Sequence, residues 1–414
     1  MFNFLKNLDR LGIRFPICQD FFYFCNMITR AISQHILTLA AKYPVISVSG
    51  PRQSGKTTLV RALFPHLTYI NFEDVELRTL AEQDPKQFLN RYPNGLIIDE
   101  AQYVPSLFSY IQLEADRRQR NGEFVLTGSQ NFLLLEKITQ SLAGRVALFN
   151  LLPFSVEELK KTPFEQLNYE DYLFKGMYPR LYEVGIDPAF YYPNYIQSYI
   201  ERDVRQLMNI SDLNKFRTFT ELCAGRVGQM YNQSSLGNDL GIDHKTADRW
   251  FSILETSFIA FTLRPYYKNF NKRITKMPKL YFYDTGIVCS LLGIRNAQQL
   301  ETHPLKGAIF ENFIIVETLK NAYNNGVRPN LYFWRDQTGN EVDLIVDKAG
   351  SLFPIEIKSA HTFKPDFFKG LNFFNTLSES KPENAYLVYG GLQNLDSPTG
   401  NIRSWNSLPN FETL

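Results

Sequence analysis

VISVSGPRQSGKTT, residues 45–58, predicts the fold of the first third of the chain. An apolar, β-rich run enters the spacing Gly50-x4-Gly55-Lys56-Thr57, and the residues that follow favour a helix. In this strand–loop–helix context, glycines let backbone N–H groups curl around phosphate oxygens at a helix N-terminus. We expect Lys56 to reach the β- and γ-phosphates of ATP and the Thr57 hydroxyl to bind Mg²⁺. The residues expected to contact the nucleotide are Gly50, Pro51, Arg52, Gln53, Ser54, Gly55, Lys56, Thr57 and Thr58.

A second motif, GLIIDEAQ (95–102), ends a predicted buried strand in two adjacent acids. Acids at the carboxyl end of a parallel strand lie where open α/β sheets bind ligands. We expect Asp99 to hold Mg²⁺ and Glu100 to deprotonate the attacking water as a general base. For an isolated Asp99 a helix N-cap would be the better interpretation, but the phosphate loop upstream favours the catalytic one.

A third predicted strand, EFVLTGSQN (123–131), ends in polar side chains, and Ser129 and Gln130 are equal candidates to sense the γ-phosphate. Ser129 is also suited to cap the following helix. In SLAGRVALF (141–149), Arg145 directly precedes another predicted strand. An arginine there can neutralise transition-state charge, in its own subunit or a neighbouring one, or form an ordinary surface ion pair.

The first part of the chain, residues 27–160, alternates strands and helices. Such alternation predicts an α/β fold, a mostly parallel sheet with helices on both faces, as in P-loop NTPases. The strands are expected near 45–49, 67–72, 95–99, 124–128 and 146–152.

The middle part, residues 161–295, is predicted to be largely helical and to end in a winged helix-turn-helix. Residues 234–254 show two amphipathic helices around a Gly241 turn, and a strand and the basic stretch KNFNKRITKMPK (268–279) follow. His244, Lys245 and Arg249 would lie on or near the second helix, which enters the major groove in DNA-binding examples. The alternatives are packing against neighbouring domains and a solvated basic tip.

The last part, residues 296–414, is predicted as an α/β domain. Its expected elements are a helix at 306–320, strands at 331–337, 340–347 and 351–358, a helix at 366–377 and a strand at 384–389.

A candidate metal site lies in this domain. Side chains alternate along strands, so Asp343, Glu356 and Lys358 should converge on one face. The carboxylates, with Glu311 from the helix, suit a second divalent metal, and Lys358 can orient a metal-bound water. The alternative is a solvated hairpin with cross-strand ion pairs.

Composition limits the classes of protein to consider. The net charge of the 414 residues is 44 − 42 = +2, which argues neither for nor against nucleic acid. The four scattered cysteines fit reduced thiols and a cytoplasmic location. No apolar run approaches the roughly 20 residues that span a bilayer, so no membrane partner is expected. Residues 1–26 are expected to be a poorly packed extension, or Met27 to be the true start.

Several motifs together resemble a family of bacterial and archaeal AAA-type ATPases with a carboxy-terminal domain of unknown function, from about Met27 to the end. They are GPRQSGKTTL (50–59), IIDEAQ (97–102), LTGSQ (126–130), SLAGRV (141–146), GMYPRLY (176–182), YIERDVRQL (199–207), WRDQTGNEVDLIV (334–346) and PIEIKS (354–359).

The resemblance implies ATP binding, a winged-helix module and a restriction-endonuclease-like PD-(D/E)xK domain. The site residues of that fold map onto Glu311, Asp343, Glu356 and Lys358. The usual Pro-Asp start is replaced by Glu341-Val342-Asp343, which weakens the inference of cleavage.

Two hypotheses follow from the sequence. In the first, the protein is a Mg²⁺-dependent ATPase that couples its nucleotide state to a DNA-associated, nuclease-like module. In the second, it is an ATP-driven regulatory switch that acts on a protein partner and carries an inactive nuclease-like domain. The sequence does not define an oligomeric state.

Overall fold

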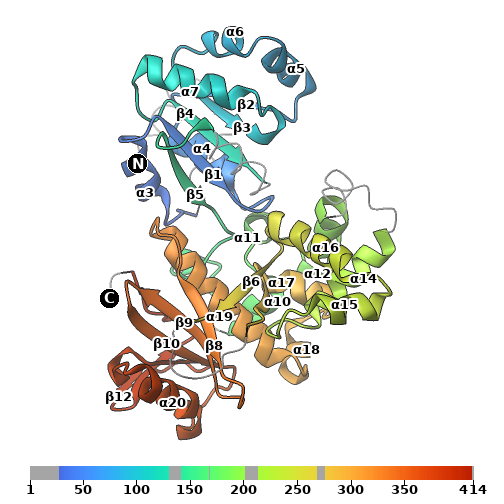
Figure 1. Cartoon of the computed structure of the whole chain (residues 1–414), viewed down its shortest axis with the longest axis vertical. Helices are drawn as coiled ribbons and strands as arrows, with labels where there is room; N and C mark the ends of the chain where they lie inside the picture. Colours follow the sequence, from blue (N-terminus) through green and yellow to red (C-terminus); the bar gives the residue numbers. More distant parts are fainter. Residues whose placement is uncertain (1–27, 130–140, 167, 201–212, 268–275, 413–414) are drawn as a thin grey trace, which may run out of the picture.

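The computed structural model describes residues 28–129, 141–166, 168–200, 213–267 and 276–412. The amino-terminal sheet lies at the top of Figure 1, and the orange-to-red carboxy-terminal sheet lies at the lower left. The helices of the middle part lie below the amino-terminal sheet and to the right of the carboxy-terminal sheet. The predicted α/β class is confirmed.

Within the described residues, five parallel strands form the amino-terminal sheet in the order β2-β3-β4-β1-β5. Their bounds are β1 Val45–Ser49, β2 Thr68–Asn71, β3 Leu96–Asp99, β4 Phe124–Gly128 and β5 Val146–Asn150. All lie where the sequence predicts strands. The phosphate loop follows β1 and the acidic pair follows β3, so both motifs meet at one edge of the sheet.

Helices cover both faces of this sheet. Along β3, Leu96 and Ile98 pack on one face and Ile97 on the other, because strand side chains alternate. One face is covered by α3 Ser33–Ala40 and α4 Lys56–Leu63; the other is covered by α5 Val75–Gln83, α6 Pro85–Asn90 and α7 Leu107–Arg118. A short 3₁₀ turn, η1 Ala101–Tyr103, follows the acidic pair. The predicted two-sided helical cover is confirmed.

The middle part is largely helical where it is described, and it also contributes two strands to the carboxy-terminal sheet. The helices between residues 156 and 302 are α9 Val156–Leu159, α10 Tyr169–Lys175, α11 Pro179–Glu183, α12 Pro188–Tyr195, η2 Ile196–Ile200, α14 Leu213–Ala224, α15 Gln233–Leu240, α16 His244–Thr256, α17 Thr285–Leu291 and α18 Ala297–Thr302.

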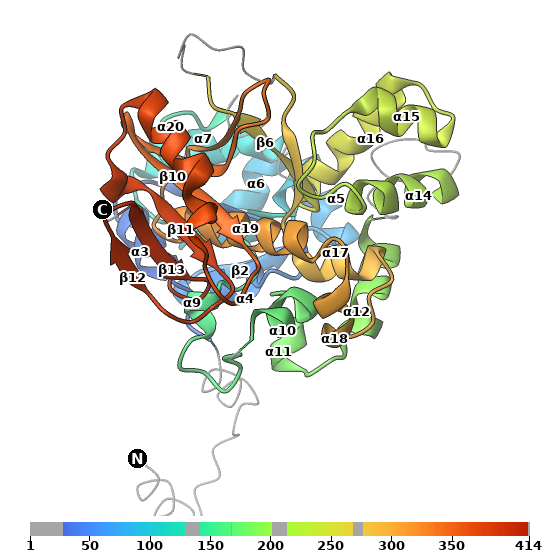
Figure 2. The same cartoon turned by 90° about the horizontal axis from the view of Figure 1, so that it is seen from below.

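The predicted helix pair around Gly241 is present as α15 and α16 (Figure 2). Gly241 has φ 63°, a left-handed conformation that glycine adopts readily. Asp243 caps α16 by accepting hydrogen bonds from the backbone N–H groups of Lys245 and Thr246. The winged-helix assignment stays a prediction, because residues 268–275 of the basic stretch lie outside the described residues.

The described carboxy-terminal sheet has eight strands in the order β12-β13-β11-β10-β9-β8-β6-β7. They are β6 Ala260–Pro265, β7 Lys279–Phe282, β8 Leu331–Arg335, β9 Glu341–Lys348, β10 Ser351–Lys358, β11 Tyr386–Tyr389, β12 Leu395–Ser397 and β13 Gly400–Ser404. The remaining elements are α19 Lys306–Asn324, η3 Pro365–Phe368, α20 Lys369–Ser378 and η4 Pro382–Asn384. Strands β6 and β7 extend the sheet from the middle part, so the two parts share one sheet. The predicted domain boundaries stay predictions.

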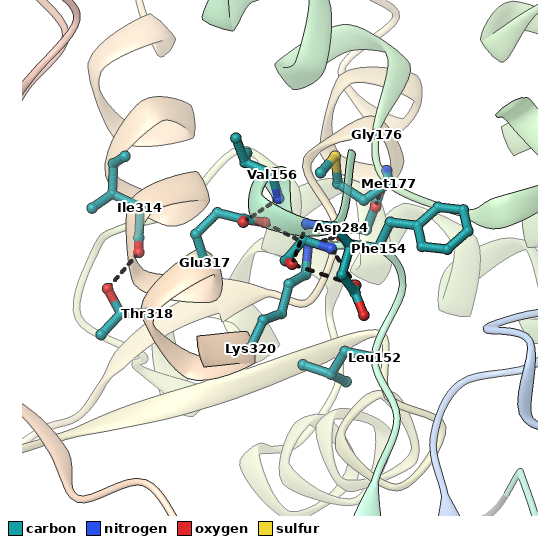
Figure 3. A network of polar contacts seen from close by, with 12 residues as sticks. Leu152, Phe154, Val156, Gly176, Met177, Asp284, Ile314, Glu317, Thr318 and Lys320 are labelled. Atoms are coloured by element: carbon teal, nitrogen blue, oxygen red, sulfur yellow. Dashed lines mark hydrogen bonds and ion pairs between the residues drawn. The ribbon is translucent and has the colours of Figure 1, made fainter. Parts of the chain in front are cut away.

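A buried polar joint ties the amino-terminal sheet to the rest of the chain (Figure 3). After β5, the chain runs past α19, where the Lys320 ammonium group donates to the Phe154 carbonyl at 2.7 Å and to Glu317 at 2.7 Å. The second oxygen of Glu317 accepts from the Val156 N–H at 2.7 Å. The Phe154 N–H donates to the Met177 carbonyl at 2.9 Å. We call this cluster, Phe154, Val156, Glu317 and Lys320, the α19 joint.

Replacing Lys320 with Met should lower the free energy of unfolding by about 3–5 kcal/mol, because Glu317 would stay buried without its cation. Urea denaturation of the full chain measures the change. Lys369→Met is the matched control: this lysine pairs with Asp366 and its side chain is 76% exposed, so its effect should stay within about 0.5 kcal/mol. Equal effects of the two substitutions would contradict the role given to Lys320.

Candidate nucleotide site and candidate metal centre

The phosphate loop connects β1 to α4 with backbone geometry that requires glycine at two positions. Gly50 has φ 156°, and a Cβ atom there would lie 2.1 Å from the Leu151 carbonyl oxygen. Gly55, the N-cap of α4, has φ 92°. Any other residue would be strained at these positions, so the two motif glycines let the loop close against the exit of β5.

The Lys56 side chain is buried inside this loop. Its ammonium group donates to the carbonyl oxygens of Gly50 and Pro51 at 3.0 and 2.8 Å. Burial lowers the pKa of Lys56, and the carboxylates of Glu100 and Asp99 oppose that effect. The ammonium group that is predicted to bind the phosphates is therefore held by carbonyl oxygens of the phosphate loop.

Asp99, the last residue of β3, accepts hydrogen bonds from several side chains. Its Oδ2 accepts from the Thr57 hydroxyl at 2.7 Å and from the Tyr69 hydroxyl at 2.8 Å, and its Oδ1 accepts from Thr127. Thr57 and Asp99, predicted to share a Mg²⁺ ion, are thus in direct contact. Their hard oxygen donors suit that ion.

Tyr69 is a site residue that the sequence analysis missed. Burial raises its pKa, and the adjacent Asp99 carboxylate adds to the effect, so Tyr69 stays a neutral hydrogen-bond donor.

Glu100 lies beside Asp99 in a left-handed conformation, with φ 52° and ψ 44°. The conformation is uncommon for a non-glycine residue. Glu100 accepts from the Ser129 hydroxyl at 3.0 Å and from the Gln102 amide. Ser129 therefore contacts the predicted general base, whereas the other candidate sensor, Gln130, lies outside the described residues.

Arg145 lies away from this edge of the sheet. It precedes the first residue of β5, and its carbonyl accepts from the N–H of Val45, the first residue of β1. The phosphate loop follows the last residue of β1, a strand length of roughly 16 Å at about 3.3 Å per residue. Arg145 forms a two-pronged ion pair with Asp116 at 2.6 and 2.9 Å. Action within its own subunit is excluded by this placement, which leaves a neighbouring subunit or a surface ion pair.

The remaining predicted contact residues differ in exposure. Arg52 and Ser54 are buried, Gln53 is partly buried and Thr58, on α4, is exposed.

Side chains from outside the sheet also contact the phosphate loop. The Tyr191 hydroxyl donates to Gln53 Oε1 at 2.9 Å, and the Tyr195 hydroxyl donates to the Arg52 carbonyl at 3.3 Å. Both tyrosines belong to α12. The nucleotide site thus lies against the middle part of the chain.

In the carboxy-terminal sheet, three predicted site residues converge on neighbouring strands. The Lys358 ammonium group lies 2.5 Å from Glu356 Oε1 and 3.6 Å from Asp343 Oδ2. Asp343 also accepts from the Ile357 N–H at 2.8 Å. Burial raises the pKa of Glu356 to about 8, and Asp343 adds to the shift. Burial alone would lower the pKa of Lys358, but the carboxylates outweigh it and raise that pKa to about 12.

The fourth predicted residue, Glu311, is held by β7 instead. It accepts from Lys279 at 3.0 Å and from the Tyr281 hydroxyl. Lys279 also forms an ion pair with Glu341, and its side chain is 4% exposed. Burial raises the pKa of Glu311 to about 7, while Lys279 opposes the shift. Lys279 belongs to the predicted basic stretch, where neighbouring residues do not indicate that a lysine is buried.

The donor set of this centre does not by itself form a metal site. In the described part of the chain, no group of three or more His, Cys, Asp or Glu side chains is arranged to hold a metal ion. Glu311 already pairs with Lys279, and Glu356 already pairs with Lys358. The second divalent metal therefore stays a prediction.

Three family descriptions match successive parts of the chain. Residues 42–160 match the family described as "AAA domain". Residues 166–298 and 306–409 match two domains of unknown function, DUF8612 and DUF4143. Across the described residues, no helix is long and apolar enough to cross a membrane.

Relatives match most of the chain. "Uncharacterized protein Rv2008c" of Mycobacterium tuberculosis is 33% identical over 323 residues, which cover 77% of this chain and 71% of that protein. An "Uncharacterized protein" of Haemophilus influenzae is 21% identical over 342 residues, which cover 75% of this chain and 81% of the relative.

Solved structures are more distant. The Walker-type ATPase PABY2304 of Pyrococcus abyssi has a TM-score of 0.42 and 16% identity, covering 64% of this chain and 96% of that one. AMPPCP-bound DnaA of Aquifex aeolicus has a TM-score of 0.29 and 12% identity, covering 54% of this chain and 85% of that one. By its matched domains and its Mycobacterium relative, the chain belongs to the family of P-loop ATPases in which an AAA domain precedes a DUF4143 domain.

Proposed function

We propose that the protein is a Mg²⁺-dependent ATPase that couples ATP turnover to movement of its middle and carboxy-terminal parts. The observation that carries this proposal is the contact of α12 with the phosphate loop, through Tyr191 and Tyr195. A ligand shifts a conformational equilibrium only if it binds the two states differently. Contacts between a binding loop and a second module provide such a difference.

The chemistry follows from the side chains at the tips of β1, β3 and β4. Lys56 neutralises charge on the β- and γ-phosphates, and Glu100 takes a proton from the attacking water. When bound through the Thr57 hydroxyl and the Asp99 carboxylate, Mg²⁺ supplies further neutralisation of phosphate charge. Ser129 holds the Glu100 carboxylate in place through its hydroxyl.

Arg145 enters this chemistry only in an assembly, where a neighbouring subunit presents it to the phosphates. It would first have to leave Asp116.

We further propose DNA as the substrate of the moving part. His244, Lys245 and Arg249 are exposed at the start of α16, where a recognition helix contacts base edges. The cluster of Asp343, Glu356 and Lys358 has the residue types for phosphodiester hydrolysis with a second divalent metal.

One observation favours the second hypothesis, a regulatory switch that acts on a protein partner. Lys279 pairs with Glu311 and Lys358 pairs with Glu356, so two carboxyl groups of the candidate metal centre have cationic partners from within the chain. Side chains that are paired in this way need no metal to hold them in place, which fits an inactive nuclease-like domain.

The ATPase assignment predicts different effects for two substitutions. Lys56→Ala should abolish binding of ATP, measured by calorimetry with Mg²⁺. Glu100→Gln should retain binding and slow hydrolysis by roughly 10²–10⁴-fold, because the general base is lost. Lys42→Ala, an exposed lysine before β1, is the control and should match the wild type. If Lys56→Ala still binds and hydrolyses ATP, the phosphate-loop assignment is wrong.

The DNA assignment predicts nicking of supercoiled plasmid with Mg²⁺ or Mn²⁺, followed on agarose gels with and without ATP. Asp343→Ala should abolish the cleavage. Asp366→Ala makes the same chemical change at a side chain that is 76% exposed and should cleave like the wild type. Intact plasmid, combined with a protein partner captured only by Glu100→Gln, would favour the switch. An ATPase rate unchanged by DNA, and no DNA binding at low salt, would remove the DNA proposal.

A further inference from the structure

Arg30, two residues before Ile32 at the start of α3, is a buried arginine that the motifs do not include. Each nitrogen of its guanidinium group donates a hydrogen bond. Nη1 donates to the Ser54 carbonyl of the phosphate loop at 2.8 Å, and Nη2 donates to the Leu152 carbonyl at 2.6 Å. Nε donates to Glu158 at 2.9 Å. One rigid planar group thus spans the phosphate loop, the exit of β5 and α9.

We propose that Arg30 is a positioning residue of the nucleotide site, which acts by orienting the peptide group between Ser54 and Gly55. A trans peptide is planar, and its C=O and N–H bonds point in opposite directions. With the Ser54 carbonyl bonded to Arg30, the Gly55 N–H is directed away from Arg30. Backbone N–H groups at this position of the loop are the ones that hold phosphate oxygens. The inference rests on nucleotide binding at this loop.

A second peptide of the loop is held in the same way. The Tyr195 hydroxyl donates to the Arg52 carbonyl, which directs the Gln53 N–H to the opposite side. Tyr195 is itself in hydrogen-bond contact with Tyr178 at 3.0 Å. Carbonyl groups of two loop residues are therefore fixed from outside the sheet. Such fixation lowers the entropy lost when the loop orders around a phosphate.

Arg30 is itself anchored to the α19 joint. Its partner Glu158 also accepts from the Ser155 N–H at 2.9 Å, in a capping box at the start of α9. The next residue, Val156, is held by Glu317 of α19. The orientation of the Ser54 carbonyl thus depends on the position of α9 and α19.

Another buried arginine allows a purely structural role to be tested. The Arg118 side chain is 7% exposed, as is that of Arg30. It donates to Glu114 and Glu123 and to backbone carbonyls, including that of Tyr92. These partners lie before β3 and β4 begin, at the edge of the sheet opposite the phosphate loop. Loss of Arg118 should therefore destabilise the same domain without reorienting the loop.

The experiment compares Arg30→Gln, Arg30→Lys and Arg118→Gln in the full chain. We would measure the Kd of Mg²⁺–ADP by calorimetry, KM and kcat for ATP, and the thermal midpoint. Arg30→Gln should weaken ADP binding and raise KM at least tenfold, with kcat changed less than threefold, because Glu100 and Ser129 are untouched. Arg30→Lys should recover part of the affinity, because it keeps the charge but loses the planar fork. Arg118→Gln should lower the thermal midpoint and leave KM within twofold.

Three results would overturn the inference. They are a folded Arg30→Gln variant with wild-type ADP affinity, an equal rise of KM in Arg30→Gln and Arg118→Gln, and an Arg30→Lys variant with wild-type KM. A wild-type KM in Arg30→Lys overturns the inference even if Arg30→Gln does not fold. A wild-type chain that binds no ADP would instead remove the proposed function.

Discussion

Lys320 and Glu317 hold the chain that leaves β5, and the link between the phosphate loop and the carboxy-terminal part depends on these contacts. This segment has neighbours on two sides. Within it, the Leu151 N–H donates to Ser49 at the end of β1 at 2.8 Å, and the Leu151 carbonyl leaves no room for a side chain at Gly50. A few residues later, Phe154 and Val156 are held by α19. The phosphate loop and α19 therefore share one short, buried segment.

Helix α19 extends this link to the candidate metal centre. Glu311 and Glu317 lie six residues apart on the helix, about 9 Å at 1.5 Å per residue. A packed helix moves as a rigid element, so a shift at one residue is transmitted to the other. The geometry provides a physical connection between the phosphate loop and the carboxy-terminal centre. Coupling of ATP turnover to movement along this connection is part of the proposed function.

Local patterns account for the parts of the structure that the sequence predicted. The strands of the amino-terminal sheet have continuous apolar runs beside glycines and acids, and α19 has a helical spacing of apolar residues. The short strands β12 and β13 were missed because they consist of three and five residues and include polar and charged ones. The placement of Arg145 could have been predicted from the sequence, because a residue just before a parallel strand lies at the end of the sheet opposite the phosphate loop.

Contacts between residues that are far apart in the sequence could not be predicted from it. Arg30 and Glu158 are separated by 128 positions, and Tyr191 and Gln53 by 138. No periodicity or motif relates such pairs, and a tyrosine-rich helix gives the same pattern whether it packs on a core or on a loop. Lys279 shows the same limit: within a basic stretch its burial depends on carboxylates from α19 and β9.

Amide hydrogen exchange of the full chain, measured with and without Mg²⁺–ADP, tests whether the nucleotide site is linked to the carboxy-terminal part. We expect slower exchange in the phosphate loop, in α9 and in α19 when nucleotide is bound, and no change in the Lys56→Ala variant. Slower exchange confined to residues 50–58, with α9 and α19 unchanged, would contradict the proposed link between the nucleotide site and the carboxy-terminal part.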